Sequence, residues 1–284
     1  MTNSHFASLK TKLDEISHHL DFEDRIQNDP VQFPRRFVDR KDIETAGLVA
    51  AVFAYGNVKA IIGNLENIFL AVKKRPADFI KEACIDKYQV FDGLYYRFNN
   101  DSDMRTLFWA IGRVFEKWGS LENLFLEVYK NEGFKQGLSN FSNVFRQLGG
   151  ISPFENQKNY NYLFPSPENN SPCKRLCLYL RWMARKDEVD PGPWQGVDTR
   201  DLVIPLDAHI TRLGRLLGLT RRKNPSWMMA REITDSLKRL SSDDPLKYDF
   251  PLCHLGISKK CEEKFVEEKC SGCSLAEACL AVSN

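Results

Sequence analysis

The sequence predicts an all-α protein on the basis of three observations. In most segments of this 284-residue chain, apolar residues recur at the three- and four-residue spacing of one helix face. Asp, Asn or Ser often precedes such a segment, and Gly or Pro often follows it, as expected for helix caps. We find no convincing run of alternating apolar and polar residues, the pattern of a half-buried strand.

The N-terminal half contains the elements of the first predicted lobe. An Asp42-capped segment, 43–55, is apolar on almost all sides, which predicts a helix in the middle of a domain. Residues 149–172, rich in Asn, Pro, Ser and Tyr, predict a long connection. Helical spacing covers residues 6–20, 43–55, 58–69, 79–84, 104–118, 121–129 and 135–148.

The C-terminal half begins with a helix from Cys173 to Arg185 whose polar face gathers Lys174, Arg181 and Arg185. After a polar connection, a second helix is capped by Asp207 and ends before Gly218. A further helix is expected over 226–240, followed by a cysteine-rich tail.

Composition limits the class of protein. Hydrophobic residues make up 43% of the chain, so a folded core is expected. The formal net charge is only +2, so a nucleic-acid partner would need locally grouped Lys and Arg. There is neither a charged-then-apolar leader nor an apolar run near 18 residues. We therefore expect a cytoplasmic protein without a membrane partner, and a monomer.

The cysteines indicate a metal site. With no export signal, the eight cysteines argue against a disulfide framework. Four thiolates with the spacing C-x8-C-x2-C-x5-C suit a zinc ion or an iron–sulfur cluster, and the spacing leaves both open. Cys253 is a weaker candidate ligand, while Cys84, Cys173 and Cys177 fit apolar helical patterns. The predicted ligands are Cys261, Cys270, Cys273 and Cys279.

Together these features resemble the helix-hairpin-helix DNA glycosylase superfamily, in particular its endonuclease III-like members. The segment 206–212, LDAHITR, resembles the family segment V-D-T-H-x-x-R that carries a catalytic aspartate. The last three cysteines keep the family spacing C-x2-C-x5-C, and a His-x-Gly at 254–256 precedes the first ligand. The family hairpin L-P-G-V-G-[RH]-K has no glycine counterpart here, where Asn169 to Lys174 reads NNSPCK. The interval from Lys174 to Asp207 and the first cysteine interval are also longer, which indicates a divergent branch.

The resemblance implies a helical barrel over 42–185 and a second lobe made of 1–41 with 186–284, which carries the cysteine loop 261–279. It implies removal of a damaged base from duplex DNA, with a 4Fe–4S cluster, or alternatively zinc, on the four cysteines. Lys174 would be the amine that forms a Schiff base and allows strand cleavage. Asp207 would be the carboxylate that stabilises positive charge on the sugar.

Further residues follow from the needs of this reaction. A flipped base requires an aromatic wall, for which Trp182 and Trp194 are candidates. Phosphate contacts require exposed cations. The candidates for these contacts are Arg175, Arg181, Arg185, Arg212 and Arg215.

Other interpretations remain open. Asp207 is a good N-cap whether or not it is catalytic, and Lys174 on a polar helix face is more often solvated than nucleophilic. The missing glycine turn favours a nucleic-acid-binding iron–sulfur protein without catalysis. A zinc-stabilised structural or interaction module is a third hypothesis.

Overall fold

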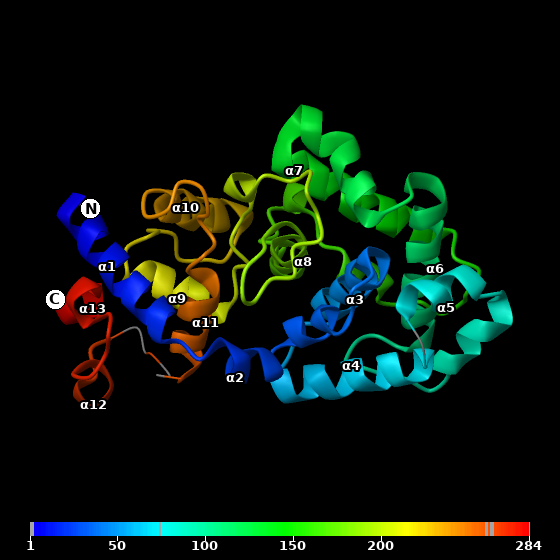
Figure 1. The fold of residues 1–284 in the computed structure, drawn as a ribbon, viewed down its shortest axis with the longest axis horizontal. Coiled ribbons are helices and arrows are strands. Elements are labelled where there is room, and N and C mark those ends of the chain that lie inside the picture. The colour runs from blue at the N-terminus through cyan, green and yellow to red at the C-terminus, as the bar shows by residue number, and fades with distance from the viewer. Residues whose placement is uncertain (1–2, 74, 259–260, 262–263, 284) are drawn as a thin grey trace.

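The computed structural model describes residues 3–73, 75–258, 261 and 264–283 and confirms the all-α fold (Figure 1). No β-strand occurs among those residues, which contain only two isolated bridges, Tyr96–Asn99 and Lys186–Pro191. Within the same ranges, no helix combines the length and the apolar character needed to cross a membrane.

The first half of the chain forms α-helices at the positions expected from helical spacing, together with a short one that was not expected, α2. Phe22–Gln27 makes up α2, which begins after its N-cap Asp21. The other helices are α1 (Asn3–His19), α3 (Arg40–Val52), α4 (Val58–Val72), α5 (Pro76–Glu82), α6 (Asp101–Trp118) and α7 (Leu121–Gly150). Helix α7 is broken at Gly133, which has φ 80° and ψ −178°, so the two predicted helices 121–129 and 135–148 are separate segments joined at a kink.

The apolar helix α3 lies in the middle of the molecule, as predicted. Every residue from Asp42 to Val52 is buried. Gly47 faces α8 (Lys174–Ala184), where an added Cβ would come within 2.6 Å of the Met183 side chain. The cap itself is Asp39, which accepts backbone N–H bonds from Lys41 and Asp42, so α3 begins earlier than predicted.

Short 3-10 helices occupy several of the connections. The long connection over 149–172 is present, and it contains two of them, η4 and η5. The 3-10 helices are η1 (Pro30–Gln32), η2 (Pro34–Arg36), η3 (Ile85–Phe91), η4 (Tyr160–Leu163), η5 (Pro167–Asn169), η6 (Thr199–Asp201) and η7 (Ala276–Ala278).

Helical spacing did not predict three helices of the C-terminal half, which are α12, α13 and the longest of the three, α11. Its sequence, DFPLCHLGIS, is apolar on nearly all sides and therefore shows no amphipathic stripe. The remaining helices of this half are α9 (Ala208–Leu216), α10 (Trp227–Lys238), α11 (Asp249–Ser258), α12 (Glu267–Cys270) and α13 (Leu280–Ser283).

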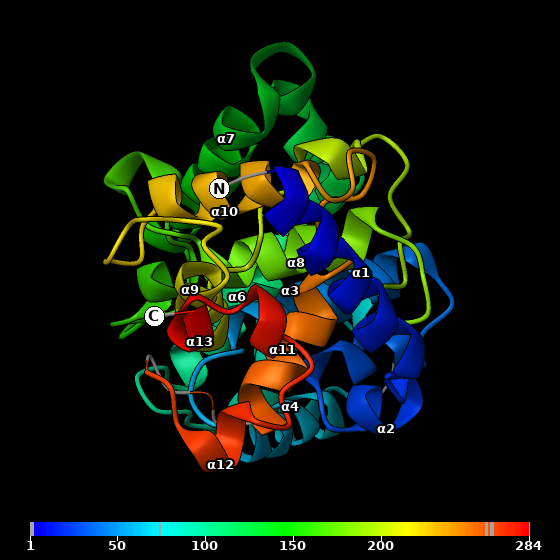
Figure 2. The same ribbon diagram turned by 90° about the vertical axis from the view of Figure 1, so that its left-hand side faces the viewer.

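The helices gather into two ends with α3 and α8 between them (Figures 1 and 2). One end contains α5 and α6, and the other contains α1, α9, α11 and α13. A single cluster of buried hydrophobic residues runs through both ends, so the two predicted lobes share one core. The lobe boundaries themselves stay a prediction.

Candidate functional site

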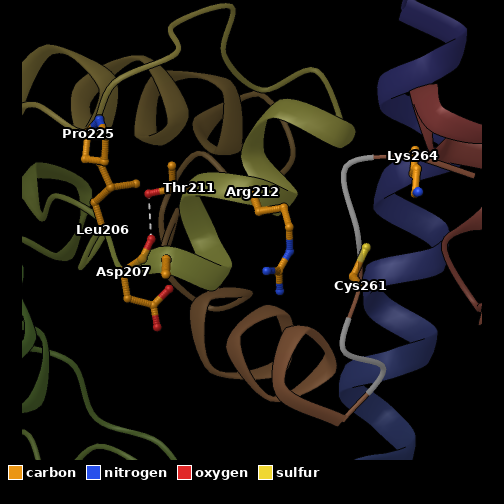
Figure 3. A pocket seen from close by; sticks show the side chains of 8 residues that line it. Leu206, Asp207, Thr211, Arg212, Pro225, Cys261 and Lys264 are labelled. Atoms are coloured by element: carbon orange, nitrogen blue, oxygen red, sulfur yellow. Dashed lines mark hydrogen bonds between the residues drawn. The ribbon is translucent and has the colours of Figure 1, made fainter. Parts of the chain in front are cut away.

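Asp207 is the N-cap of α9 and lines an open pocket (Figure 3). Its Oδ1 accepts the backbone N–H of Ile210 at 2.7 Å, and its Oδ2 accepts the thiol of Cys253 at 3.3 Å. The side chain is half-buried, so the carboxylate is held in one orientation while remaining accessible. The pocket is lined by Leu206, Asp207, Ala208, Thr211, Arg212, Pro225, Cys261 and Lys264.

Lys174 is the first residue of α8. The preceding residue, Cys173, has φ 48°, a left-handed conformation that sets the direction in which the helix starts. The Lys174 Nζ donates to the carbonyl oxygen of Ala54 at 3.3 Å, at the end of α3.

Helix α11 links the helix of Lys174 to the helix of Asp207. Arg181 lies seven residues after Lys174, hence on the same face of α8 and about 10 Å along its axis. The Arg181 guanidinium donates to Asp249 of α11, and Cys253, one turn further along α11, donates to Asp207. Burial raises the pKa of Asp249 to about 6 against the opposing effect of Arg181, and the charge of Asp207 adds to the rise.

Asp29 lies in the same neighbourhood, although its sequence context did not identify it as a site residue. It caps η1 by accepting the N–H of Val31 at 2.9 Å. Burial raises the pKa of Asp29, and the charges of Arg181 and Lys174 oppose this rise. The pKa of Cys253 is raised by burial and then by the charges of Asp207, Asp249 and Asp29. The sequence contained one signal for Asp29, its position directly before Pro30. That position indicates a helix cap, but it does not indicate which side chains from other segments lie near the carboxylate.

Among the predicted phosphate contacts, Arg175, Arg181 and Arg185 lie inside the protein, so that prediction is wrong for these three. All three are less than a tenth exposed. Arg175 donates to the backbone oxygens of Val52 and Tyr162. A buried guanidinium engaged in this way is not available to DNA, because turning it outward would leave its buried partners unpaired at a high cost.

Two of the four carboxylates opposite the other two arginines, Asp187 and Asp190, come from the long interval between Lys174 and Asp207. Arg181 donates to Asp190 at 2.9 Å, and Arg185 donates to the same carboxyl group at 2.8 Å. Arg185 also pairs with Asp187 at 2.7 Å and with Asp244 at 2.8 Å. This interval therefore neutralises much of the basic face of α8. Arg212 lines the Asp207 pocket and Arg215 is half-buried on α9, so for these two residues phosphate contact stays a prediction.

The two tryptophans proposed as a base wall are core residues, which corrects that prediction too. Trp182 is fully buried, and Trp194 is 3% exposed. The Trp194 Nε1 donates to Glu44 of α3 at 2.8 Å. Neither ring has a free face for a base, because both are packed on all sides.

The four tail cysteines converge on one cavity. Cys261, Cys270, Cys273 and Cys279 all line it, with apolar walls that include Leu213 of α9. Burial raises the pKa of the Cys261 thiol, and the charges of the other three cysteines act on it as well. In the described part of the chain, no three His, Cys, Asp or Glu side chains are already close enough to hold a metal ion.

The chemistry of this donor set fits the implied metal centre. Four thiols around an apolar cavity match what zinc or an iron–sulfur cluster requires, because both take thiolate ligands and both are shielded by apolar side chains. Cys253 does not line this cavity and instead contacts Asp207. Cys261 lines both the cysteine cavity and the Asp207 pocket, so the two sites adjoin.

Comparison with known proteins gives one match. No curated protein and no solved structure matches this chain. The family model described as "Protein of unknown function (DUF2400)" matches residues 29–258, a range that includes α3 to α11 and so contains Asp29, Lys174, Asp207 and Cys253. Because the match spans well over half of the chain, the protein belongs to the DUF2400 family.

Proposed function

We propose that this protein is a DNA base-excision enzyme, a glycosylase with lyase activity that acts on a damaged base. Lys174 is the nucleophile of this proposal and Asp207 its carboxylate. The substrate is duplex DNA with one damaged nucleotide turned out of the stack.

The proposed reaction begins at the anomeric carbon of the damaged nucleotide. The neutral Lys174 amine attacks this carbon, the bond to the base breaks, and the base leaves with the bonding electron pair and takes up a proton. Loss of the amine proton and opening of the sugar ring then give a Schiff base. Removal of a proton from the adjacent sugar carbon expels the 3′ phosphate and cuts the strand.

Asp207 has a separate role in the proposal. As the base leaves, positive charge develops on the sugar, and a fixed carboxylate lowers the energy of that state. The two bonds that Asp207 accepts, from Ile210 and Cys253, hold the carboxylate in place before substrate binds. A group that is already oriented spends no free energy on reorientation during the reaction.

The observation that carries the proposal is the contact path from α8 through α11 to α9. Arg181, on the Lys174 face of α8, contacts Asp249, and Cys253 on the same helix contacts Asp207. The charge of Lys174 lowers the pKa of Asp29, and the charges of Asp207 and Asp29 raise the pKa of Cys253. From this path we infer that the amine and the carboxylate border one region of the fold, although they are far apart in sequence.

The metal centre has a structural part in this proposal. The four tail cysteines would hold a 4Fe–4S cluster or, alternatively, zinc. Such a centre would fix the tail beside α9, where Cys261 adjoins the Asp207 pocket.

The test is covalent trapping with borohydride. Wild-type protein is incubated with duplexes that carry an abasic site or an oxidised base, and borohydride reduces any Schiff base to a stable amine. A protein–DNA adduct visible on a denaturing gel is expected for the wild type and not for Lys174→Gln. Lys59→Gln, an exposed lysine on α4, is the matched control and should cross-link normally.

A second variant tests the carboxylate. Asp207→Asn keeps an N-cap side chain, so α9 should persist while release of the base slows at least a hundredfold. Asp39→Asn makes the same change at the cap of α3 and should leave the rate unchanged. Trapping that survives in Lys174→Gln would remove Lys174 from the mechanism. Absence of any adduct or base release from the metal-loaded wild type would overturn the proposal.

A further inference from the structure

Three aromatic side chains gather on the surface beside Lys174. Tyr55 follows α3, Phe98 precedes α6, and Tyr162 belongs to η4. The rings of Tyr55 and Phe98 stack with centroids 6.1 Å apart and planes within 10°. Tyr162 meets both edge-on, at 5.3 Å from Tyr55 and 5.6 Å from Phe98. We call these three residues the aromatic cluster.

The aromatic cluster is exposed. Phe98 is 51% exposed and Tyr162 is 46% exposed, while Tyr55 is half-buried. Single exposed apolar residues are common on protein surfaces, but three rings in mutual contact leave a continuous aromatic surface in water. Such a surface indicates a binding site.

Hydrogen bonds hold the aromatic cluster in place. The Tyr55 hydroxyl donates to the Asn99 side chain at 2.6 Å, and the Asn159 side chain donates to the backbone oxygen of Phe98 at 2.6 Å. The rings are thus oriented before any ligand binds, which lowers the entropy lost on binding.

Arg175 supports the aromatic cluster from inside. Its guanidinium lies 4.4 Å from the centre of the Tyr162 ring and 5.2 Å from that of Tyr55. It also donates to the backbone oxygens of Val52 and Tyr162. The arginine is only 8% exposed, so its charge acts on the rings from behind rather than on solvent.

Positive groups border the aromatic cluster. The exposed Arg97 has its guanidinium 5.8 Å from the centre of the Phe98 ring and packs over Gly56, next to Tyr55. The Lys174 Nζ contacts the oxygen of Ala54, the other neighbour of Tyr55. An aromatic surface between cations suits a ligand that has flat rings joined by phosphates.

We propose that the aromatic cluster is a stacking platform for an unpaired nucleobase of a DNA strand. The inference rests on the proposed function only in taking DNA as the ligand, and it requires no catalysis. An unpaired base stacks on the Phe98 ring, and Tyr162, whose plane is nearly perpendicular to that ring, meets the base at its edge, while Arg97 contacts the adjacent phosphate. The platform replaces the base wall that Trp182 and Trp194, as core residues, do not provide.

The experiment compares two single strands of equal length, one with normal bases and one with abasic sites throughout, by fluorescence anisotropy on the full-length, metal-loaded protein. Stacking on one or two rings should make the base-bearing strand bind about tenfold more tightly. Phe98→Ala and Tyr162→Ala should lose this preference and should bind the abasic strand as the wild type does. Tyr162→Phe keeps the ring and should keep the preference.

Control variants distinguish a loss of base stacking from misfolding and from a general loss of positive charge. Phe98→Leu preserves apolar volume without a π face, so it should fold and still lose the preference. Trp109→Ala removes an aromatic residue that contacts Arg113 and lines a different cleft, and it should have no effect. Arg97→Gln should weaken binding of both strands equally and reduce its salt dependence.

The outcomes distinguish this inference from the proposed function. Equal binding of the two strands by the wild type, or an unchanged preference in Phe98→Leu and Tyr162→Ala, would overturn the platform even if borohydride trapping succeeds. A changed oligomeric state in these variants, with DNA binding unaltered, would identify the aromatic cluster as a protein–protein contact and also overturn it. If the Phe98 and Tyr162 variants lose the preference for the base-bearing strand, while the wild type forms no adduct with borohydride, the platform is supported and the enzyme is rejected.

Discussion

Individual side chains in α11 have environments that their residue types do not reveal. His254 is 8% exposed, and its ring lies 4.2 Å from that of Phe250. Burial, together with the charges of Arg25 and Arg181, lowers the pKa of His254 to about 4. The imidazole is therefore neutral in the folded protein at neutral pH and packs against the Phe250 ring.

This environment predicts a pH dependence of stability. Between the unfolded pKa of about 6.5 and the folded value of about 4, the unfolded state binds more protons, so stability falls as the pH falls. Relative to His254→Phe, the wild type should lose on the order of 3 kcal/mol of unfolding free energy from pH 7 to pH 4. Urea unfolding at several pH values measures this difference. Curves that stay parallel over that range would contradict a buried neutral histidine.

Helix α11 packs closely against α9, the helix that Asp207 caps. Gly256 packs against α9 so closely that an added Cβ would lie 2.9 Å from the Cβ of His209. The glycine is thus required by helix packing. Its conformation is not the reason, since Gly256 lies within the regular span of α11.

Gly256→Ala should therefore separate α11 from α9 and destabilise the protein by about 1–3 kcal/mol. The Cys253–Asp207 contact should loosen with it. Gly63→Ala is the matched control, because nothing lies within 4 Å of an added Cβ there and the change should stabilise α4 by about 0.5–1 kcal/mol. Thermal unfolding of the two variants tests this, and equal melting temperatures would refute the packing argument.

The buried ion pair between α8 and α11 leads to a second prediction about how the helices are held together. Arg181 is 3% exposed, and Arg181→Met would leave Asp190 and Asp249 buried without their main partner. We expect a loss of about 3–5 kcal/mol, partly recovered in the double variant Arg181→Met/Asp249→Asn. Arg36→Met breaks an exposed pair with Glu66 and should cost at most about 1 kcal/mol. Denaturant unfolding distinguishes the two, and similar losses would show that Arg181 is not a buried anchor.

For the whole molecule, the cysteine tail closes one end against the N-terminal helix. Elements α1 and η7 are in contact, and Lys12 pairs with Glu277 at 3.6 Å. In Figure 2, α1 and α13 lie on the same side of the molecule. A metal on the tail cysteines would therefore join the two ends of the chain.

Removal of that metal should destabilise the whole chain. Cys273→Ser should lower bound iron or zinc well below one centre per chain and lower the melting temperature by several degrees. Cys84→Ser, at an exposed cysteine away from the tail, should change neither. Elemental analysis and thermal scans measure both effects. A Cys273→Ser protein with full metal content and an unchanged melting temperature would exclude the four-cysteine centre.

Local pattern was enough to predict much of this protein. Helical spacing predicted the all-α class and most helices, because a helix that packs on a core must repeat its apolar residues every three or four positions. The caps at Asp207 and Asn57 were equally readable, since both satisfy backbone N–H groups within their own helix. The four tail cysteines line one cavity, while their role as metal ligands stays a prediction.

Only the tertiary structure decided what lies opposite each side chain. The polar face of α8 predicted a surface for phosphate, but Arg181 is buried there against Asp190, from the loop after α8, and Asp249, from the distant helix α11. The aromatic cluster joins residues from three separate connections, so no local window contains it. Local sequence determines which face of a helix is polar, whereas the packing of distant segments determines whether that face meets water, a carboxylate or a ligand.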